Sequence, residues 1–171
     1  MKDLIIVDGY NFIFNCYQVG ATSSEMLSYL RERLIRDLSQ YKNYINCNLI
    51  VVFDAKNSDN PIRSIEKVNN IEVIYSKGGE TADTIVEEIV HKQQNFNRIF
   101  VVTSDYVQQK VVFKKNIYRK SVREFKIELG NFKKELKDKI ELEKKAAEKK
   151  LYQIEKRLDK KTKEKFSKFI K

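Results

Sequence analysis

The stretch Leu4-Ile5-Ile6-Val7-Asp8-Gly9-Tyr10-Asn11 decides how the rest of the chain is interpreted. Four uninterrupted aliphatic residues, closed by Asp and Gly, predict a short strand that is buried on both faces. Such strands belong to parallel sheets covered by helices, whose ligands bind at the carboxyl ends of the strands. Asp8 is therefore a candidate for chemistry. Gly9 is expected to permit a sharp turn, and Asn11 to bring a polar group to the same edge. The alternative is that Asp8 only accepts hydrogen bonds from the following turn.

The pattern of an apolar run that ends in Asp recurs along the chain. Asp54 closes the run 49–53, and Asp105 closes the run 98–104. Shorter strands are predicted at 73–75 and near 117–118. The segment 12–17 is expected to be a loop, and Thr22 and Thr81 are expected to begin helices. The predicted helices cover 22–43, 82–95, 106–113 and 120–130. This β-α-β-β-α-β-α-β order predicts a parallel-rich sheet between helices.

Charge is distributed unevenly over the 171 residues, whose net charge is +10. Residues 1–109 contain 11 Lys and Arg against 14 Asp and Glu, whereas residues 110–171 contain 23 against 10. A basic C-terminal third predicts a polyanionic partner, either nucleic acid or a ribosome. A genome that favours lysine codons would explain some of the lysines, but not the negative charge of the first 109 residues.

Several classes of protein are excluded by composition. A single histidine, His91, excludes His-based metal sites and Ser-His-Asp triads. No G-x-x-x-x-G-K-[ST] sequence is present, so a P-loop nucleotide cofactor is excluded. Cys16 and Cys47 are interpreted as buried free thiols of a reducing cytosol rather than a disulfide. No apolar run reaches the roughly 20 residues of a membrane span, and residues 1–3 leave no room for a signal peptide. We therefore expect a cytoplasmic protein without a membrane partner.

Acidic residues from separate segments are expected to meet at one edge of the sheet. They are Asp8, Asp54 and Asp105 at strand ends, with Glu80 and Asp83 where a helix starts. Crowded carboxylates repel one another unless a cation neutralises them. Oxygen ligands alone favour Mg²⁺ or Mn²⁺, which suits phosphodiester chemistry beside a basic surface. Each acid also has a local alternative: Asp54 as a turn cap, and Asp83 as an ordinary helix-start residue. A phosphorylation receiver domain is disfavoured, because no second acid follows Asp8.

Five short motifs resemble, in order, those of the YacP-like NYN-domain proteins, a bacterial branch of the PIN-like nucleases. They are Val7-Asp8-Gly9-Tyr10-Asn11, Val52-Phe53-Asp54-Ala55, Glu80-Thr81-Ala82-Asp83, Thr103-Ser104-Asp105-Tyr106 and Arg119-Lys120-Ser121. The resemblance spans about residues 3–130. It implies a PIN-like three-layer α/β/α sandwich with a mainly parallel central sheet over 1–130, followed by a lysine-rich helical extension over 131–171.

The resemblance also implies a function. It suggests a metal-dependent endoribonuclease that uses Mg²⁺ (or Mn²⁺) and cleaves mRNA in a translation-dependent way at the ribosomal A site. By motif, Asp8, Asp83 and Asp105 match the metal-binding acids, and Asn11, Asp54 and Glu80 match supporting polar positions. The chain departs from the family where Asn116-Ile117-Tyr118 replaces a Gly-Ala type turn, and where the tail lacks prolines.

Residues beyond Asp105 are expected to bind RNA. The basic candidates are Lys110, Lys114, Lys115, Arg119, Lys120 and Arg123, and the candidates for base stacking are Tyr10, Phe12, Tyr106 and Tyr118. Core packing is the alternative role for these aromatics. The extension either docks on ribosomal RNA or packs on the domain as a charged amphipathic helix. Two alternative functions remain open: a non-catalytic RNA- or ribosome-binding module of the same fold, and a toxin-type tRNA nuclease.

Overall fold

The computed structural model of the chain describes residues 2–17, 23–54, 61–92, 96–104 and 116–157. The chain divides into two units, residues 1–129 and residues 130–171. The first unit contains the sheet and the candidate site. The second contains most of a long helix, as far as Arg157, where the described part of the chain ends.

The first unit is built on one sheet. Among the described residues, six strands pair in the order β3-β4-β2-β1-β5-β6. Their bounds are β1 (Leu4–Asp8), β2 (Asn48–Phe53), β3 (Ser64–Val68), β4 (Ile71–Tyr75), β5 (Ile99–Val102) and β6 (Ile117–Lys120). All neighbouring strands are parallel except β3, which runs antiparallel to β4 at one edge. The central strands are buried on both faces, as their uninterrupted aliphatic runs predict.

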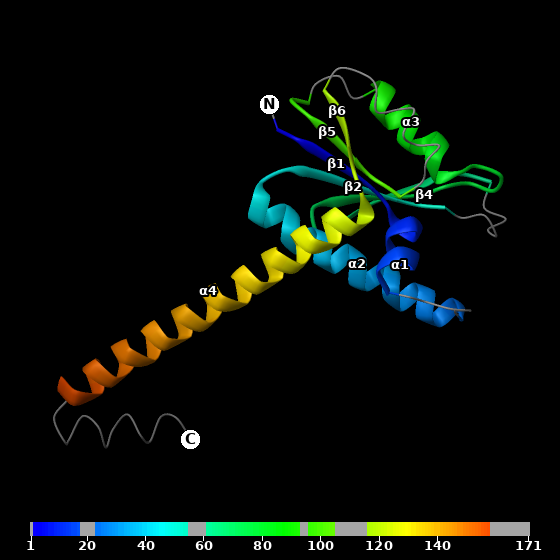
Figure 1. The fold of residues 1–171 in the computed structure, drawn as a ribbon. Coiled ribbons are helices and arrows are strands. Elements are labelled where there is room, and N and C mark those ends of the chain that lie inside the picture. The colour runs from blue at the N-terminus through cyan, green and yellow to red at the C-terminus, as the bar shows by residue number, and fades with distance from the viewer. Residues whose placement is uncertain (1, 18–22, 55–60, 93–95, 105–115, 158–171) are drawn as a thin grey trace. The chain divides into compact units, whose positions relative to one another are not determined.

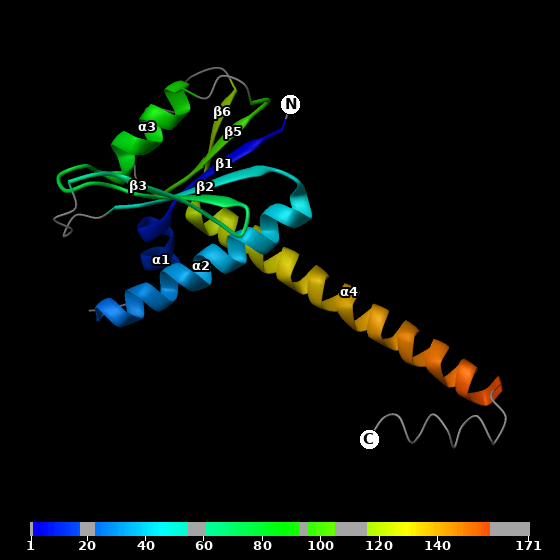
Figure 2. The same ribbon diagram turned by 180° about the vertical axis from the view of Figure 1, so that it is seen from behind.

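Helices cover both faces of the sheet. They are α1 (Gly9–Tyr17), α2 (Ser24–Ile45), α3 (Ala82–Lys92) and α4 (Val122–Arg157). Figures 1 and 2 show α3 on one face, and α1 and α2 on the other. This arrangement confirms the predicted three-layer α/β/α sandwich with a mainly parallel sheet.

Alternation along the strands determines which face each side chain occupies. Leu4 and Ile6 of β1 belong to a buried cluster that includes Ile85 and Val86 of α3. Because successive side chains in a strand point to opposite faces, Asp8 lies on the same face as Ile6. Asp8 is therefore on the side of the sheet that α3 covers.

The first turns of α4 complete the layer on the other face. Ser121 caps the helix by accepting the Glu124 backbone N–H at 3.2 Å, and the Glu124 carboxylate accepts the Ser121 N–H at 2.8 Å. Phe125 then packs edge-on against Phe12 of α1 and Tyr41 of α2. The predicted helical segments 120–130 and 131–171 are thus one helix as far as Arg157.

Three local predictions differ from the structure. The predicted loop over 12–17 is wrong, since this segment belongs to α1 and buries Phe12, Ile13 and Cys16 on one side. The strand β3 was not predicted, because its alternating residues are mostly exposed at the sheet edge. The N-cap of α2 is Ser23, one residue after the predicted start. The predicted helix over 106–113 lies outside the described residues.

One other expectation is met. Both cysteines are buried and free of disulfides. Among the described helices, none combines the length and the apolar character that crossing a bilayer requires.

Gly9 is needed for close packing and not for an unusual backbone angle. A Cβ atom at this position would overlap the ring of Phe53, which ends the neighbouring strand β2. The Phe53 ring also packs between Tyr10 and Tyr75, at centroid distances of 5.3 and 5.5 Å. It therefore has little room to move, and the missing side chain allows α1 to start directly above the strand ends.

We predict that Gly9→Ala destabilises the protein by about 1–3 kcal/mol, the usual cost of overpacking a core. The matched control is Gly130→Ala in α4, where an added Cβ would meet no atom within 4 Å. That change should be neutral or slightly stabilising, because Ala favours helix over Gly. Urea unfolding followed by far-UV circular dichroism measures both. Equal stability of the Gly9→Ala protein and the wild type would contradict the packing argument.

Candidate nucleic-acid-cleaving site

The candidate site lies at the edge of the sheet where the parallel strands end. The register aligns Asp8 of β1 with Val52 of β2, and Phe53 of β2 with Tyr75 of β4. On the other side of β1, Val7 aligns with Val102 of β5. The residues that follow each strand therefore emerge along one rim. Polar residues occupy this rim: Asp8, Asp54, Ser76 and Thr103.

Asp8 ends β1 and caps α1. Its Oδ1 accepts a hydrogen bond from the Asn11 backbone N–H at 3.1 Å, the geometry of a helix N-cap. Its side chain is largely buried, with 8% exposed. The alternative role suggested by the sequence, in which Asp8 accepts a hydrogen bond from the following turn, is thus present in the structure. It does not exclude ligation, because a carboxylate has acceptor capacity for more than one partner.

Asn11 connects two strand ends. Its side-chain Oδ1 accepts the Ser104 backbone N–H at 3.1 Å and the Asn15 amide at 3.2 Å. Ser104 follows β5 and directly precedes Asp105 in sequence. Asn11 therefore links the segment that carries Asp8 to the segment that leads into Asp105. Asp105 itself lies outside the described residues.

The first turn of α3 brings a second acid to the same face. Thr81 caps this helix, as predicted, since its Oγ1 accepts the Thr84 backbone N–H at 3.3 Å. Asp83 is half-buried in the first turn. Because α3 connects β4 to the parallel strand β5, its N-terminus lies at the carboxyl edge of the sheet. Asp83 and Asp8 thus belong to the same edge and the same face.

Asp54 joins the rim through a serine that sequence reasoning did not identify. Ser76 directly follows β4 and is buried. Its hydroxyl donates a hydrogen bond to Asp54 Oδ1 at 3.4 Å. The Ser76 backbone N–H donates to the Phe53 carbonyl at 3.0 Å. These bonds hold the ends of β2 and β4 together and orient the Asp54 carboxylate.

The acids at the rim have the chemistry of a hard-cation site. Asp8, Asp54 and Asp83 provide only oxygen donors, which suit Mg²⁺ or Mn²⁺. Within the described ranges, no three His, Cys, Asp or Glu residues are gathered closely enough to hold a metal. Asp105, the third acid expected in such a group, is not among the residues that were searched.

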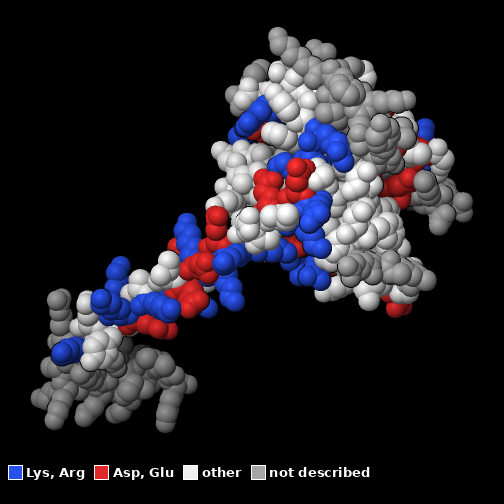
Figure 3. Space-filling model, viewed as in Figure 1, with Lys and Arg blue, Asp and Glu red and all other residues white. Residues whose placement is uncertain are grey.

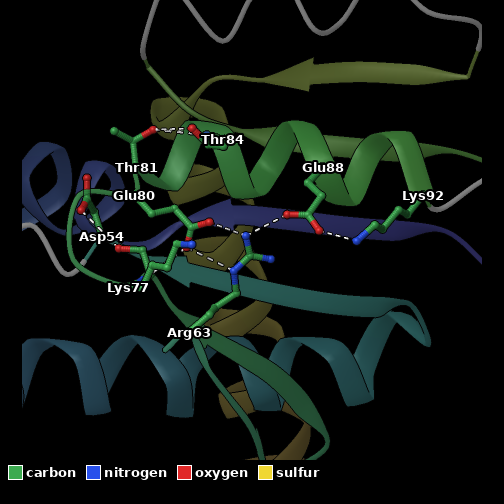
Figure 4. A network of polar contacts seen from close by, with 9 residues as sticks. Asp54, Arg63, Lys77, Glu80, Thr81, Thr84, Glu88 and Lys92 are labelled. Carbon is green, nitrogen blue, oxygen red and sulfur yellow. Dashed lines mark hydrogen bonds and ion pairs between the residues drawn. The ribbon is translucent and has the colours of Figure 1, made fainter. Parts of the chain in front are cut away.

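Glu80 is engaged by an arginine (Figure 4). Arg63 binds its carboxylate with two nitrogens, Nη2 at 2.5 Å and Nε at 3.2 Å, and Nη2 also contacts Glu88 at 2.8 Å. Glu88 pairs in addition with Lys92. The Lys77 backbone N–H donates to the same Glu80 carboxylate at 3.3 Å. Hydrogen bonds from Arg63 are the main cause that lowers the pKa of both glutamates, that of Glu88 to about 2.

The predicted basic residues have different environments. Lys110, Lys114 and Lys115, together with Tyr106, lie outside the described residues. Arg119 and Arg123 are exposed, whereas Lys120 pairs with Glu128 at 2.5 Å and its ammonium lies over the Phe100 and Phe125 rings. Arg119 aligns with Val101, a member of the cluster on the α3 face. Arg119 therefore lies on the same face as Asp8, and Lys120 on the opposite face.

Most of the described aromatic candidates pack against other parts of the protein. Phe12 is a core residue, with 3% exposed. The hydroxyl of Tyr10 accepts a hydrogen bond from Arg31 at 2.9 Å, and its ring contacts Phe14 and Phe53. Tyr118 is more exposed, at 47%. Phe12 therefore packs in the core, which was the alternative to base stacking.

The second unit carries a mixed charge along its described length. Lysines and acids are interspersed on α4 beyond residue 130 (Figure 3), and Lys145 pairs with Glu141 at 2.9 Å. Several of its apolar side chains are exposed, among them Ile140, Leu151 and Ile154. The helix thus presents both ionic and apolar groups.

We predict that the Arg63 network stabilises the fold above about pH 4.5 and loses this effect as the pH falls. The pKa of both glutamates is lower in the folded protein than the ordinary value of 4.5. Their protonation in acid therefore favours the unfolded state. Arg63→Met should lower the Tm by about 2–4 °C at pH 7. The difference from the wild type should shrink as the pH falls from about 5 toward 2. Thermal scans by circular dichroism measure it, and a difference that stays constant with pH would contradict this assignment.

Comparisons with known proteins place the chain in a family. Residues 5–171 match the family model of the YacP-like NYN domain. The protein YacP of Bacillus subtilis is 35% identical over 126 residues, which cover 71% of this chain and 72% of that protein. The crystal structure of Rae1 (YacP) from Bacillus subtilis superposes with a TM-score of 0.71 at 30% identity, covering 97% of this chain and 95% of that one. A mutant of the same protein gives 0.68 at 31% identity, covering 81% and 82%. The chain is therefore a member of the YacP-like NYN-domain family.

Proposed function

We propose that this protein is a cytoplasmic, divalent-metal-dependent endoribonuclease whose active site is the carboxyl rim of the sheet. The observation that supports the proposal is that Asp8, at the end of β1, and Asp83, in the first turn of α3, belong to the same edge and the same face of the sheet. The Asn11 link to Ser104, which precedes Asp105, adds to it. A protein that only bound RNA would gain nothing from acids at this position, because carboxylates repel phosphates.

Asp8, Asp83 and Asp105 would hold the ion, with Asp54 as a further ligand candidate. A bound Mg²⁺ or Mn²⁺ would activate water and stabilise charge that develops on the phosphate. Asn11 orients the segment before Asp105 through its bond to the Ser104 N–H. Glu80 supports the rim through its ion pair with Arg63. No described side chain at the rim is a neutral-pH base such as histidine.

The proposed substrate is mRNA on translating ribosomes. Two observations support it: membership of the YacP-like NYN-domain family, and the excess of basic residues after position 110. The A-site region of the ribosome would then present the RNA, and the basic residues would contact phosphates of mRNA or ribosomal RNA. Arg119 is a described basic residue suited to this role, because it is exposed and shares the face of Asp8.

We predict that Asp8→Asn lowers cleavage by at least about 100-fold and leaves the fold intact. Asn caps helices as well as Asp does, so the hydrogen bond to the Asn11 N–H is retained while the ligand charge is lost. The assay compares cleavage of naked mRNA and of mRNA on translating ribosomes. The chelator EDTA is used on naked RNA only, since ribosomes themselves require Mg²⁺.

The control for this experiment is Asp3→Asn, which removes an acid at the opposite edge of the sheet, where Asp3 pairs with Arg98. Cleavage by this control should match the wild type. Cutting restricted to ribosomes, and absent with Asp8→Asn, would support both the proposed site and the ribosomal substrate. Wild-type activity in the Asp8→Asn protein would overturn the site. RNA or ribosome binding without cleavage by the wild type would identify a non-catalytic binding module instead.

We predict that Arg119→Ala weakens RNA binding several-fold and reduces the slope of log K against log salt by about 1. Binding of a single-stranded RNA is measured by fluorescence anisotropy in the Asp8→Asn background, so that the RNA stays intact. Arg36→Ala, an exposed charge on α2, is the matched control, because α2 covers the other face of the sheet. Equal effects of the two substitutions would mean that only net charge matters.

A further inference from the structure

The contacts of Arg63 attach α3 to the edge of the sheet at two separate points. Arg63 directly precedes β3, and the antiparallel register aligns its neighbour Ser64 with Tyr75, the last residue of β4. From this position its guanidinium reaches Glu80 before α3 and Glu88 in the second turn (Figure 4). Attachment at two points restricts both sliding of the helix along its axis and rotation about it. Asp83 lies between the two points.

The loop that leads into α3 is shaped by a glycine, a tight turn and a capping threonine. Gly79 adopts a left-handed backbone with φ of 76°, and the Glu80 N–H donates to the Lys77 carbonyl at 3.1 Å to close a turn. Thr81 is exposed, and it caps the helix through neutral hydrogen bonds to Thr84. The bidentate pair between Arg63 and Glu80 adds a charged contact at this end, and the Glu80 side chain is 10% exposed. Paired hydrogen bonds of this type fix direction as well as distance.

We propose that Arg63 is a positioning residue of the nuclease site: by holding Glu80 and Glu88 it fixes the first turn of α3 and thereby the Asp83 carboxylate. This inference rests on the proposed function, and it changes the role expected of Glu80. Both Glu80 oxygens accept hydrogen bonds from Arg63, and one also accepts the Lys77 N–H. We therefore assign Glu80 to this attachment, as the carboxylate that holds Arg63 at the start of α3.

The alternative is that Arg63 only stabilises the fold, as many partly exposed ion pairs do weakly. A purely stabilising pair and a positioning pair differ in what they change at a temperature where the protein is fully folded. Loss of positioning should lower kcat and metal affinity while the RNA affinity stays constant, because misplacement of a ligand by about 1 Å can cost 100-fold in rate. Loss of stability alone shifts the unfolding transition and speeds amide exchange across the protein, but it leaves kcat and metal affinity unchanged.

The test uses Arg63→Met, which keeps an unbranched apolar stem and removes the guanidinium, and Arg63→Lys, which keeps the charge but not the paired geometry. The matched control is Arg98→Met, which removes an arginine that also binds a carboxylate with two nitrogens, Asp3 at 2.5 and 3.3 Å, at the opposite edge of the sheet. Three quantities are measured well below the Tm: kcat and KM for RNA cleavage, affinity for Mn²⁺ by titration calorimetry, and hydrogen exchange of amides 82–86 in the metal-free protein.

We expect Arg63→Met to lower kcat by about 10–100-fold with little change in KM, to weaken Mn²⁺ binding at least several-fold, and to speed exchange at 82–86. Arg63→Lys should fall between this variant and the wild type, and Arg98→Met should match the wild type. Wild-type values of kcat, Mn²⁺ affinity and exchange in a folded Arg63→Met protein would overturn the inference. So would equal effects of Arg98→Met.

The design distinguishes a variant that fails to fold from a failure of the proposed function. If Arg63→Met does not fold, Glu80→Gln, which breaks the ion pair and keeps the size of the side chain, is measured in its place with the same expectations. If the wild type cleaves no RNA, the proposed function fails. The positioning of Asp83 is then judged by Mn²⁺ affinity and amide exchange, which need no turnover. Unchanged values of both would overturn it independently of the nuclease proposal.

Discussion

The register of the parallel strands is the constraint on which the candidate site depends. Hydrogen bonding between β4, β2, β1 and β5 aligns their last residues at one edge. A slip by one residue would exchange the two faces of a strand and remove side chains such as Leu4 and Ile6 from their packing against α3, so the packing helps to specify the register. Polar residues that are far apart in sequence thus become neighbours without any direct attraction between them. Their mutual repulsion, if they are ionised together, is opposed by the packing of the sheet.

The polar residues at the rim have structural roles as well as the proposed catalytic ones. Asp8 caps α1, Asn11 holds the segment after β5, and Ser76 holds Asp54. Such bonds restrict each side chain to one orientation before any ligand is present. This pre-organisation is what a site of several weak oxygen ligands requires, since each ligand that must be ordered on binding reduces the affinity. Capping and ligation are therefore compatible roles of one carboxylate.

Sequence reasoning found the parts of the fold that have a local signal. The strands β1 and β2 and their terminal acids were predictable, because burial on both faces demands an unbroken apolar run. The strand β3 was not, because an edge strand with exposed Glu66 and Lys67 looks like a loop. The helix α1 was missed, because its nine residues are too few, and too uniformly apolar and aromatic, to show a clear period.

The residues of the candidate site likewise divide into those with a local sequence signal and those without one. The positions of Asp8, Asp54 and Asp83 at strand ends and at a helix start could be predicted, because apolar runs and helix-start residues are local patterns. Arg63 could not, since its partners are 17 and 25 residues away and no local pattern reports such a pair. The buried Ser76 was also missed, because a serine after a strand is common in loops. Contacts between distant segments, unlike strand ends, have no signature in a single sequence.

The central claim is that acids from separate segments bind one common ion. The most direct measurement is the anomalous difference density of a crystal grown with Mn²⁺. The account predicts one site, or a close pair of sites, with carboxylate oxygens of Asp8, Asp83 and Asp105 within about 2.5 Å of the metal. Manganese bound elsewhere, or no ordered manganese at this rim at millimolar concentration, would contradict it.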